Sequence, residues 1–305
     1  MDGGERLERA LVALEGLSVG DAFGQQIMNL PPAIALSVLE RRVLRRPPWP
    51  FTDDTYMALS IVSILRAHGR IEPDALARSF ADRYEPHHGY GESMHTLLQS
   101  LREGEPWQTA TAAMFGGQGS YGNGAAMRVA PLGAYFAGDL DTCAEQAALS
   151  ARVTHAHPEA SAGAVAVAVA AAVAAQSAVD GDRLSRAALI DRVLPYVPDS
   201  AVRAGLVRAR DLPAGTTAAQ AAAILGSGEG VSAQDTVPFT LWCAGESPDD
   251  YERAIWLTAA GLGDMDTTCA IVGGIVALSA GIEAIPTEWR ARRAPLPGWF
   301  RQDSG

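Results

Sequence analysis

The 305-residue chain lacks the sequence features typical of extracellular, membrane-spanning and general nucleic-acid-binding proteins. Its three cysteines include no CxxC pair, which argues against a disulfide framework and favours reduced thiols in the cytoplasm. Its 24 basic side chains face 35 acidic ones, and the formal net charge of −11 argues against general binding to a nucleic-acid backbone. The N-terminal segment carries charges of both signs and shows no export signal.

Long apolar runs are also lacking. The longest, residues 162–175, has about 14 residues of mostly Ala and Val, fewer than the roughly 20 needed to cross a bilayer. It predicts a buried helix and no membrane partner. The chain has neither a GxSxG motif nor a Walker A lysine, which excludes a typical serine hydrolase and a P-loop NTPase.

Alternating β-patterns are scarce and alanine dominates the second half, so the fold class expected is all-α. With 48% hydrophobic residues, the chain can form one substantial core. We expect a monomer with a single domain over 1–289 and a peripheral tail over 290–305. Periodicity predicts helices at 5–17 (ending near Gly20), 54–67, 73–84, 92–102, 106–115, 124–136, 141–152, 158–178, 183–195, 198–209, 248–261 and 267–281, and loops at 211–217 and 227–232.

Two short acidic motifs precede apolar helical stretches. The first, TDDT at 52–55, is on its own typical of a helix N-cap with acids favoured by the helix dipole. The second, GDMDT at 263–267, has two carboxylates separated by one residue, a spacing that suits metal ligands. If the two helix starts meet, the candidate ligands are Thr52, Asp53, Asp54, Asp264, Asp266 and Thr267.

Carboxylate and hydroxyl oxygens favour a hard divalent cation, and zinc would require His or Cys beside them. Four clustered carboxylates repel one another, and a pair of divalent ions would relieve that repulsion. The two motifs together therefore predict a site for two Mg²⁺ ions, with Mn²⁺ as an alternative and Ca²⁺ also compatible with the ligand type.

A glycine-rich segment, GGQGSYGNG at 116–124, matches GxGxxG, but the stretch before it has helical rather than strand composition. A dinucleotide-binding turn is therefore disfavoured. A loop whose exposed amides approach a phosphate or diphosphate is the more useful hypothesis, and a purely structural loop is the alternative. His155 and His157 lack a third zinc ligand nearby, which favours capping or ligand contact, and His87 and His88 are expected in a surface loop.

Taken in order, these segments resemble the ADP-ribosylglycohydrolase family, including the dinitrogenase-reductase-activating glycohydrolases. The resemblance covers roughly residues 16–281. It is carried by GLSVGDAFG (16–24), FTDDTYMALSI (51–61), GSYGNGAAMRVAPLG (119–133), VTHAHPEA (153–160), TVPFTLWC (236–243) and GLGDMDTTCAIVGGIVALSAG (261–281). It implies a compact all-α bundle with a binuclear Mg²⁺ site that cleaves the glycosidic bond between ADP-ribose and an acceptor.

The resemblance also implies residue roles. The residues of the two acidic motifs correspond to the metal ligands, with Asp53 and Asp54 in the catalytic group. His155 resembles a substrate-contacting histidine, and Val231 is placed near the adenosine end. The loop that holds the diphosphate and the proximal ribose corresponds to Gly117, Gly119, Ser120, Tyr121, Gly122 and Asn123.

Two positions depart from the family pattern. Met28 stands where many members carry a glutamate, and Gly89-Tyr90-Gly91 lacks an aspartate of the dinitrogenase-reductase-activating members, with Glu92 nearby. The leading hypothesis is an ADP-ribosyl hydrolase acting on a protein side chain, a nucleic acid or a small molecule. A noncatalytic ADP-ribose-binding or nucleotide-binding protein is the alternative that Met28 favours, and a purely structural helical protein is the third.

Overall fold

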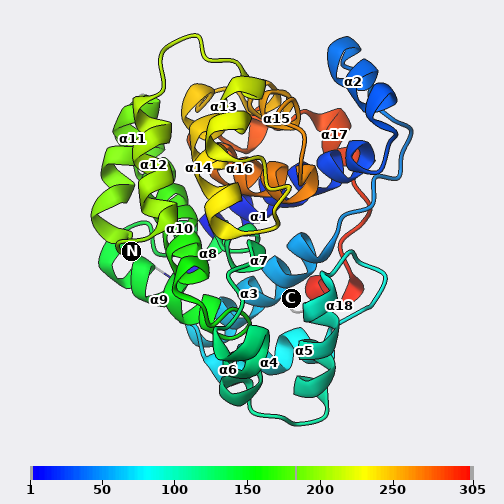
Figure 1. Ribbon diagram of the computed structural model, residues 1–305, viewed down its shortest axis with the longest axis vertical. Coiled ribbons are helices and arrows are strands. Elements are labelled where there is room, and N and C mark those ends of the chain that lie inside the picture. The colour runs from blue at the N-terminus through cyan, green and yellow to red at the C-terminus, as the bar shows by residue number, and fades with distance from the viewer. Residues whose placement is uncertain (1–2, 183, 303–305) are drawn as a thin grey trace.

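The computed structural model describes residues 3–182 and 184–302, and within them the protein is all-α, as predicted (Figure 1). These residues contain no strand, only two isolated β-bridges. Two 3-10 turns, Leu194–Tyr196 and Ile282–Ala284, accompany the α-helices. The helices are α1 Gly3–Met28, α2 Pro32–Arg41, α3 Asp53–His68, α4 Pro73–Asp82, α5 Glu92–Arg102, α6 Trp107–Gly117, α7 Gly124–Met127, α8 Ala130–Tyr135, α9 Leu140–Arg152, α10 Pro158–Asp180, α11 Arg186–Val193, α12 Ala201–Asp211, α13 Ala218–Leu225, α14 Ala233–Glu246, α15 Tyr251–Ala259, α16 Met265–Ala280, α17 Thr287–Arg292 and α18 Gly298–Gln302.

The helix α10 forms the middle of the core, because alanine and valine leave it apolar on every side. It packs against α7, α8, α9, α14 and α16. Within the described ranges it is the one helix that is long and apolar enough to cross a membrane, with a mean hydropathy of 1.9. However, 83% of that apolar window is buried inside the protein, as expected for a core helix. The prediction of a buried helix is therefore confirmed.

A second packing unit pairs α1 with α16 through a row of glycines. Gly16, Gly20 and Gly24 recur every four residues and so lie on one face of α1. A Cβ atom at any of them would come within 2.1–2.3 Å of a backbone oxygen of α16. The close helix contact therefore depends on the missing side chains.

This contact explains a wrong prediction. The sequence predicted that the first helix ends near Gly20, but α1 continues to Met28. Glycine is a poor helix former on its own, yet here tertiary packing against α16 outweighs that preference. As a result the acidic residue Asp21 lies inside a buried helix.

Other element predictions were partly right. The predicted helix 124–136 forms two helices, α7 and α8, which are separated by Arg128 and Val129. The helices α2, α13, α14, α17 and α18 were not predicted. The helix α14 contains Pro238, which packs against Gly205 of α12. The range predicted at 183–195 forms α11 and a 3-10 turn, with Arg183 outside the described residues.

The C-terminal segment, predicted as a peripheral tail over 290–305, contacts two earlier parts of the chain. The Trp49 backbone N–H donates to the Arg292 oxygen, and the Ala294 N–H donates to the Trp49 oxygen. Arg293 forms an ion pair of 3.2 Å with Glu15 of α1. Residues 303–305 lie outside the described ranges, and the domain boundary at 289 stays a prediction.

Figure 1 shows how the helices are distributed. The helices α11 and α12 lie side by side at one edge, while α4, α5 and α6 gather below α3. The helix α2 extends away from the rest at the upper right. The first residues of α3 and α16 are held together by α1, which packs against both helices.

Candidate active site

The start of α3 is held in place by Asp21 of α1. Both Asp21 carboxylate oxygens accept the Thr52 backbone N–H, at 3.0 and 3.1 Å, and one accepts the Thr55 N–H at 3.1 Å. The hydroxyls of Thr52 and Thr55 also lie within hydrogen-bond distance of this carboxylate. Asp21 thus satisfies two N–H groups that a helix start leaves without intrahelical partners. This anchor fixes where Asp53 and Asp54 point.

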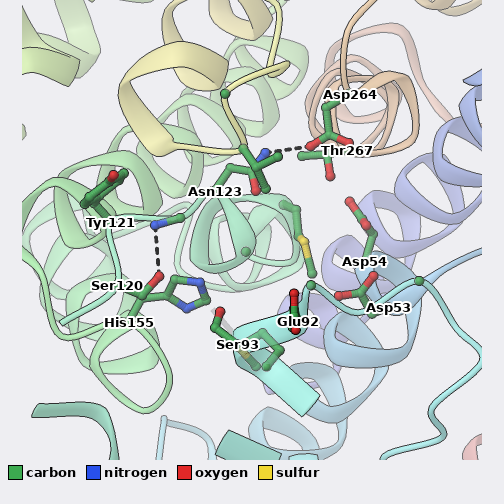
Figure 2. A pocket seen from close by; sticks show the side chains of 18 of the residues that line it. Asp53, Asp54, Glu92, Ser93, Ser120, Tyr121, Asn123, His155, Asp264 and Thr267 are labelled. Carbon is green, nitrogen blue, oxygen red and sulfur yellow. Dashed lines mark hydrogen bonds between the residues drawn. The ribbon is translucent and has the colours of Figure 1, made fainter. Parts of the chain in front are cut away.

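Asp53 and Asp54 begin α3 and are buried at the edge of the cleft (Figure 2). Burial, followed by the charge of Asp21, raises the pKa of Asp53 to about 8. The same two causes raise the pKa of Asp54 well above its ordinary value. Burial raises the pKa of Asp21 itself to about 6, although its hydrogen bonds favour the ionised form. Without a counter-charge, the three carboxyl groups therefore resist being ionised together.

The start of α16 supplies the second acidic group. Asp264 is the residue before the helix, and Asp266 and Thr267 lie in its first turn. Burial, followed by the charge of Asp264, raises the pKa of Asp266 well above its ordinary value. Figure 2 shows Asp264 and Thr267 on the side of the cleft where Asp53 and Asp54 also lie. Two motifs about 210 positions apart in the sequence are therefore brought together, as the sequence analysis required.

The glycine-rich loop lies across the cleft from the acids and is tied to them by Asn123. The Asn123 side-chain amide donates to Asp264 at 2.7 Å and to the Thr236 hydroxyl at 3.0 Å. The Ser120 hydroxyl accepts the Gly122 N–H at 3.1 Å, which shapes the turn. The loop is further paired with the segment before α14 through the Gly122–Ser232 bridge.

His155 lies beneath this loop. Its ring faces Gly122 and Gly124, where a Cβ atom would come within 3.1 Å of the ring nitrogen Nε2. Its other nitrogen, Nδ1, is 2.7 Å from the Thr154 hydroxyl. Burial and the nearby charge of Arg128 lower the pKa of His155 to about 3, so the imidazole is neutral at physiological pH. A neutral imidazole at this place can donate a hydrogen bond to a ligand or accept one from it.

Together these groups line a cleft of about 770 Å³. Two aromatic rings stand at its far end, Phe115 with 56% and Tyr121 with 44% of the residue surface exposed. Their ring centroids are 6.3 Å apart. Large exposed aromatic side chains that line a cleft are suited to stacking on a planar ring of a ligand.

Most of the candidate residues from the sequence line this cleft, and three do not. The lining set from the predictions is Asp53, Asp54, Ser120, Tyr121, Gly122, Asn123, His155, Val231, Asp264, Asp266 and Thr267. Thr52 lies behind the cleft, where its hydroxyl is 2.9 Å from Asp54. Gly119 packs against Ala156 and His157, and Gly117 faces open space. The roles of all these residues stay predictions.

Sequence reasoning missed Asp21 as a site residue, although it lies within the GLSVGDAFG segment. The available signal was an acidic residue flanked by glycines inside an otherwise apolar stretch. It also missed Phe115, Ser93 and Met94, which line the cleft. Because these residues sit in helices or turns with no motif of their own, only their position in the fold reveals them.

The donor set fits hard divalent cations. Asp21, Asp53, Asp54 and Asp266 are all buried carboxylates, and the Asp54 Oδ1 oxygen is buried with no hydrogen-bond partner in the described residues. An unpaired buried carboxylate oxygen is costly unless a cation or a donor compensates it. Oxygen ligands from carboxylates and a threonine hydroxyl are those that Mg²⁺ and Mn²⁺ prefer.

Comparison with known proteins places the chain in a class. A model of the ADP-ribosylglycohydrolase family matches residues 2–303, and the chain therefore belongs to that family. The family consists of hydrolases of ADP-ribose glycosidic bonds, so membership supports a hydrolase activity of this kind. The resemblance drawn from the six sequence segments is confirmed.

Several particular proteins are similar along most of their length. The chain is 28% identical to ADP-ribosylhydrolase ARH3 of Gallus gallus, covering 91% of this chain and 85% of that one. It is 30% identical to the uncharacterized protein YegU of Escherichia coli, covering 94% and 92%. It is 26% identical to ADP-ribosylarginine hydrolase Tri1 of Pseudomonas putida, covering 93% and 74%.

A solved structure shares the fold. A chain of an ADP-ribosylglycohydrolase-related protein complex superposes with a TM-score of 0.67 at 24% identity, covering 98% of this chain and 95% of that chain. At this level of identity the likeness concerns the fold alone.

Proposed function

We propose that this protein is a Mg²⁺-dependent hydrolase that releases ADP-ribose from an ADP-ribosylated acceptor. The observation that carries the proposal is the meeting of two acidic helix starts beside a glycine-lined cleft of about 770 Å³. A cleft of this size suits a ligand as large as ADP-ribose. The acceptor can be a protein side chain, a nucleic acid or a small molecule. Nothing in the proposed site requires a second subunit.

The aromatic end of the cleft supports a nucleotide ligand. An adenine ring can stack on Tyr121 and Phe115, and base stacking on an aromatic side chain is worth about 1–3 kcal/mol. From there the diphosphate would run along the loop 119–124, whose glycines leave the backbone accessible. The scissile bond would then lie near Asp53 and Asp264, at the acidic end.

The residues present can hold two Mg²⁺ ions at the acidic end. The holding groups would be the side chains of Thr52, Asp53, Asp54, Asp264, Asp266 and Thr267. Bound there, the ions would neutralise the carboxylates, orient the ribose hydroxyls and lower the pKa of an attacking water. The anchor through Asp21 keeps the first half of this ligand set fixed relative to the second.

Hydrolysis needs a proton to leave the water and a proton to reach the acceptor. The water oxygen forms a bond to the ribose anomeric carbon, and the bond from that carbon to the acceptor breaks with its electron pair on the acceptor atom. We assign the water proton to the Asp53 carboxylate, which lies at the cleft surface and would pass the proton to the departing acceptor atom. Positioning of the ribose by the loop and by His155 would supply much of the remaining acceleration.

Met28 lines the cleft where many family members carry a glutamate, and a thioether cannot accept a proton at neutral pH. Glu92, the first residue of α5, lines the same cleft as Asp53 (Figure 2). It offers a second carboxylate for proton transfer. Replacement of Glu92 by glutamine would then lower turnover without loss of ADP-ribose binding.

The proposal is tested with a panel of ADP-ribosylated arginine, serine and DNA substrates. We expect release of ADP-ribose with Mg²⁺ or Mn²⁺, loss of turnover with EDTA, and recovery when the metal is restored. Asp264→Ala should lose about a hundredfold or more in kcat. The matched control is Asp191→Ala on α11, an exposed aspartate paired with Arg210 away from the cleft lining.

The outcomes separate the hypotheses left open by the sequence. Full turnover by metal-free protein would overturn the proposal. Tight binding of ADP-ribose in calorimetry, without product from any substrate, would favour the noncatalytic binding protein to which Met28 points. If neither Mg²⁺ nor ADP-ribose raised the melting temperature, the result would favour the third hypothesis, a purely structural helical protein.

A further inference from the structure

The loop between α4 and α5 holds a second group of metal-ligating side chains, separate from the aspartates. It consists of Glu85, His87 and His88. Across the described ranges, this is the one group of three or more such side chains whose ligand atoms all lie within 4.8 Å of one another. From the sequence, His87 and His88 are expected only as part of a surface loop.

The local fold of the chain brings the three side chains together. The His88 N–H donates to the Glu85 backbone oxygen at 3.2 Å, which closes a turn around Pro86. The ring of His88 is fixed from behind by Tyr56, at a centroid distance of 3.9 Å, and by Phe51. The His87 ring lies against it at 4.4 Å. One imidazole is therefore immobilised, and the other two ligands are carried by the same short turn.

Two of the three distances between ligand atoms match the geometry of a tetrahedral metal site, and the third lies within 4.8 Å. The Glu85 Oε2 oxygen is 3.4 Å from His87 Nε2 and 3.2 Å from His88 Nε2. Zinc bonds to imidazole nitrogen and carboxylate oxygen are about 2.0–2.2 Å, which places neighbouring tetrahedral ligands about 3.3–3.6 Å apart. Both distances lie close to that range before any adjustment.

We propose that Glu85, His87 and His88 form a site for a divalent transition metal, with Zn²⁺ as the best match. Two imidazoles and one carboxylate favour zinc over Mg²⁺, which prefers oxygen ligands alone. His87 and Glu85 have 75% and 50% of their side-chain surface exposed, so the fourth position is open to water. The assignment of this site does not rest on the proposed hydrolase activity.

The site would act on the catalytic cleft through the backbone. The His88 oxygen accepts the Asp53 N–H at 2.7 Å, and Gly89, the next residue, lines the cleft. A metal bound to the loop would therefore restrain the segment that contacts the start of α3. This gives an expected rise in melting temperature on zinc binding, because a ligand that binds only the folded state stabilises it.

The test uses the full chain, stripped of metal by chelation and then kept in millimolar Mg²⁺ so that the aspartates are saturated. Zn²⁺ is titrated by calorimetry, and Co²⁺ is titrated in parallel because a tetrahedral Co²⁺ site has strong visible absorption. We expect one Zn²⁺ per chain. His87→Ala should weaken its binding at least about tenfold, as expected when metal coordination is disturbed. It should also lose the tetrahedral Co²⁺ spectrum.

Two further variants make the result decisive. His68→Ala removes another exposed histidine, at the end of α3, and should leave zinc binding unchanged. Asp264→Ala disturbs the aspartate cluster and should also leave zinc binding unchanged. Equal zinc affinity in wild type and His87→Ala would overturn the proposal, as would loss of zinc binding in Asp264→Ala. Because His87 is largely exposed, its removal does not threaten the fold.

Discussion

The contact between α1 and α16 gives a sharp prediction for Gly20→Ala. A Cβ atom at this position would lie 2.1 Å from the Cys269 backbone oxygen. An ordinary contact begins at 3.4 Å, so the atoms must separate by 3.4 − 2.1 = 1.3 Å. The obstructing atom belongs to the backbone of a core helix and cannot rotate away as a side chain can. The two helices must therefore move apart.

The free energy follows from two opposing effects. Overpacking of a close-packed core costs about 1–3 kcal/mol, occasionally more. The better helix propensity of alanine offsets about 1 kcal/mol. Since the clash is with backbone, we take the overpacking cost at its upper end and expect a net destabilisation of about 2 kcal/mol. The free energy of unfolding of a typical protein is only about 5–15 kcal/mol, so this loss is readily measured.

The same movement should weaken metal binding. Asp21 follows Gly20 directly, and Asp266 lies three residues before Cys269, so separating the helices displaces the Asp21-anchored start of α3 from the acids of α16. Urea unfolding measures the stability loss, and the Mg²⁺-dependent rise in Tm measures the loss of affinity. The control is Gly3→Ala, where a Cβ atom meets nothing within 4 Å. A Gly20→Ala protein as stable as wild type would refute the packing argument.

Three further predictions follow from the site. Asp21→Ala leaves the buried backbone N–H groups of Thr52 and Thr55 without their acceptor, at about 1–3 kcal/mol each, so urea unfolding should show a loss of about 2–6 kcal/mol. A change below about 1 kcal/mol would contradict the capping role. The pKa of Asp53 is raised to about 8, so the metal-free folded protein keeps a proton that the unfolded chain releases near its ordinary pKa of 3.8. Stability of the metal-free protein should therefore fall as pH rises from about 4 towards 8, and Mg²⁺ should raise Tm more at about pH 8 than at about pH 5.5. A larger Mg²⁺ effect at the acidic pH would argue against these carboxylates as ligands. Tyr121→Ala should weaken ADP-ribose binding by about 1–3 kcal/mol in calorimetry, and unchanged affinity would exclude base stacking on this ring.

The sequence determined the features that depend on local patterns. The long run of alanine and valine was enough to predict a buried helix at α10, and the capping residues Thr52, Asp53 and Asp54 were enough to predict the start of α3. The spacing of Asp264 and Asp266 and their pairing with the first acidic motif predicted that the two helix starts meet, and the metal ions they would hold stay a prediction. These signals work because helix propensity, capping and ligand spacing act over a few residues.

Only the tertiary structure decided the features that depend on distant partners. Gly20 continues α1 instead of ending it, because α16 comes close enough to need a residue without a side chain. The same packing places Asp21 where its carboxylate accepts hydrogen bonds from the start of α3, and no local sequence pattern predicts this role. The ring pair Phe115 and Tyr121 likewise arises from a distance between side chains. Such distances are set by how whole helices pack, and a linear pattern does not contain them.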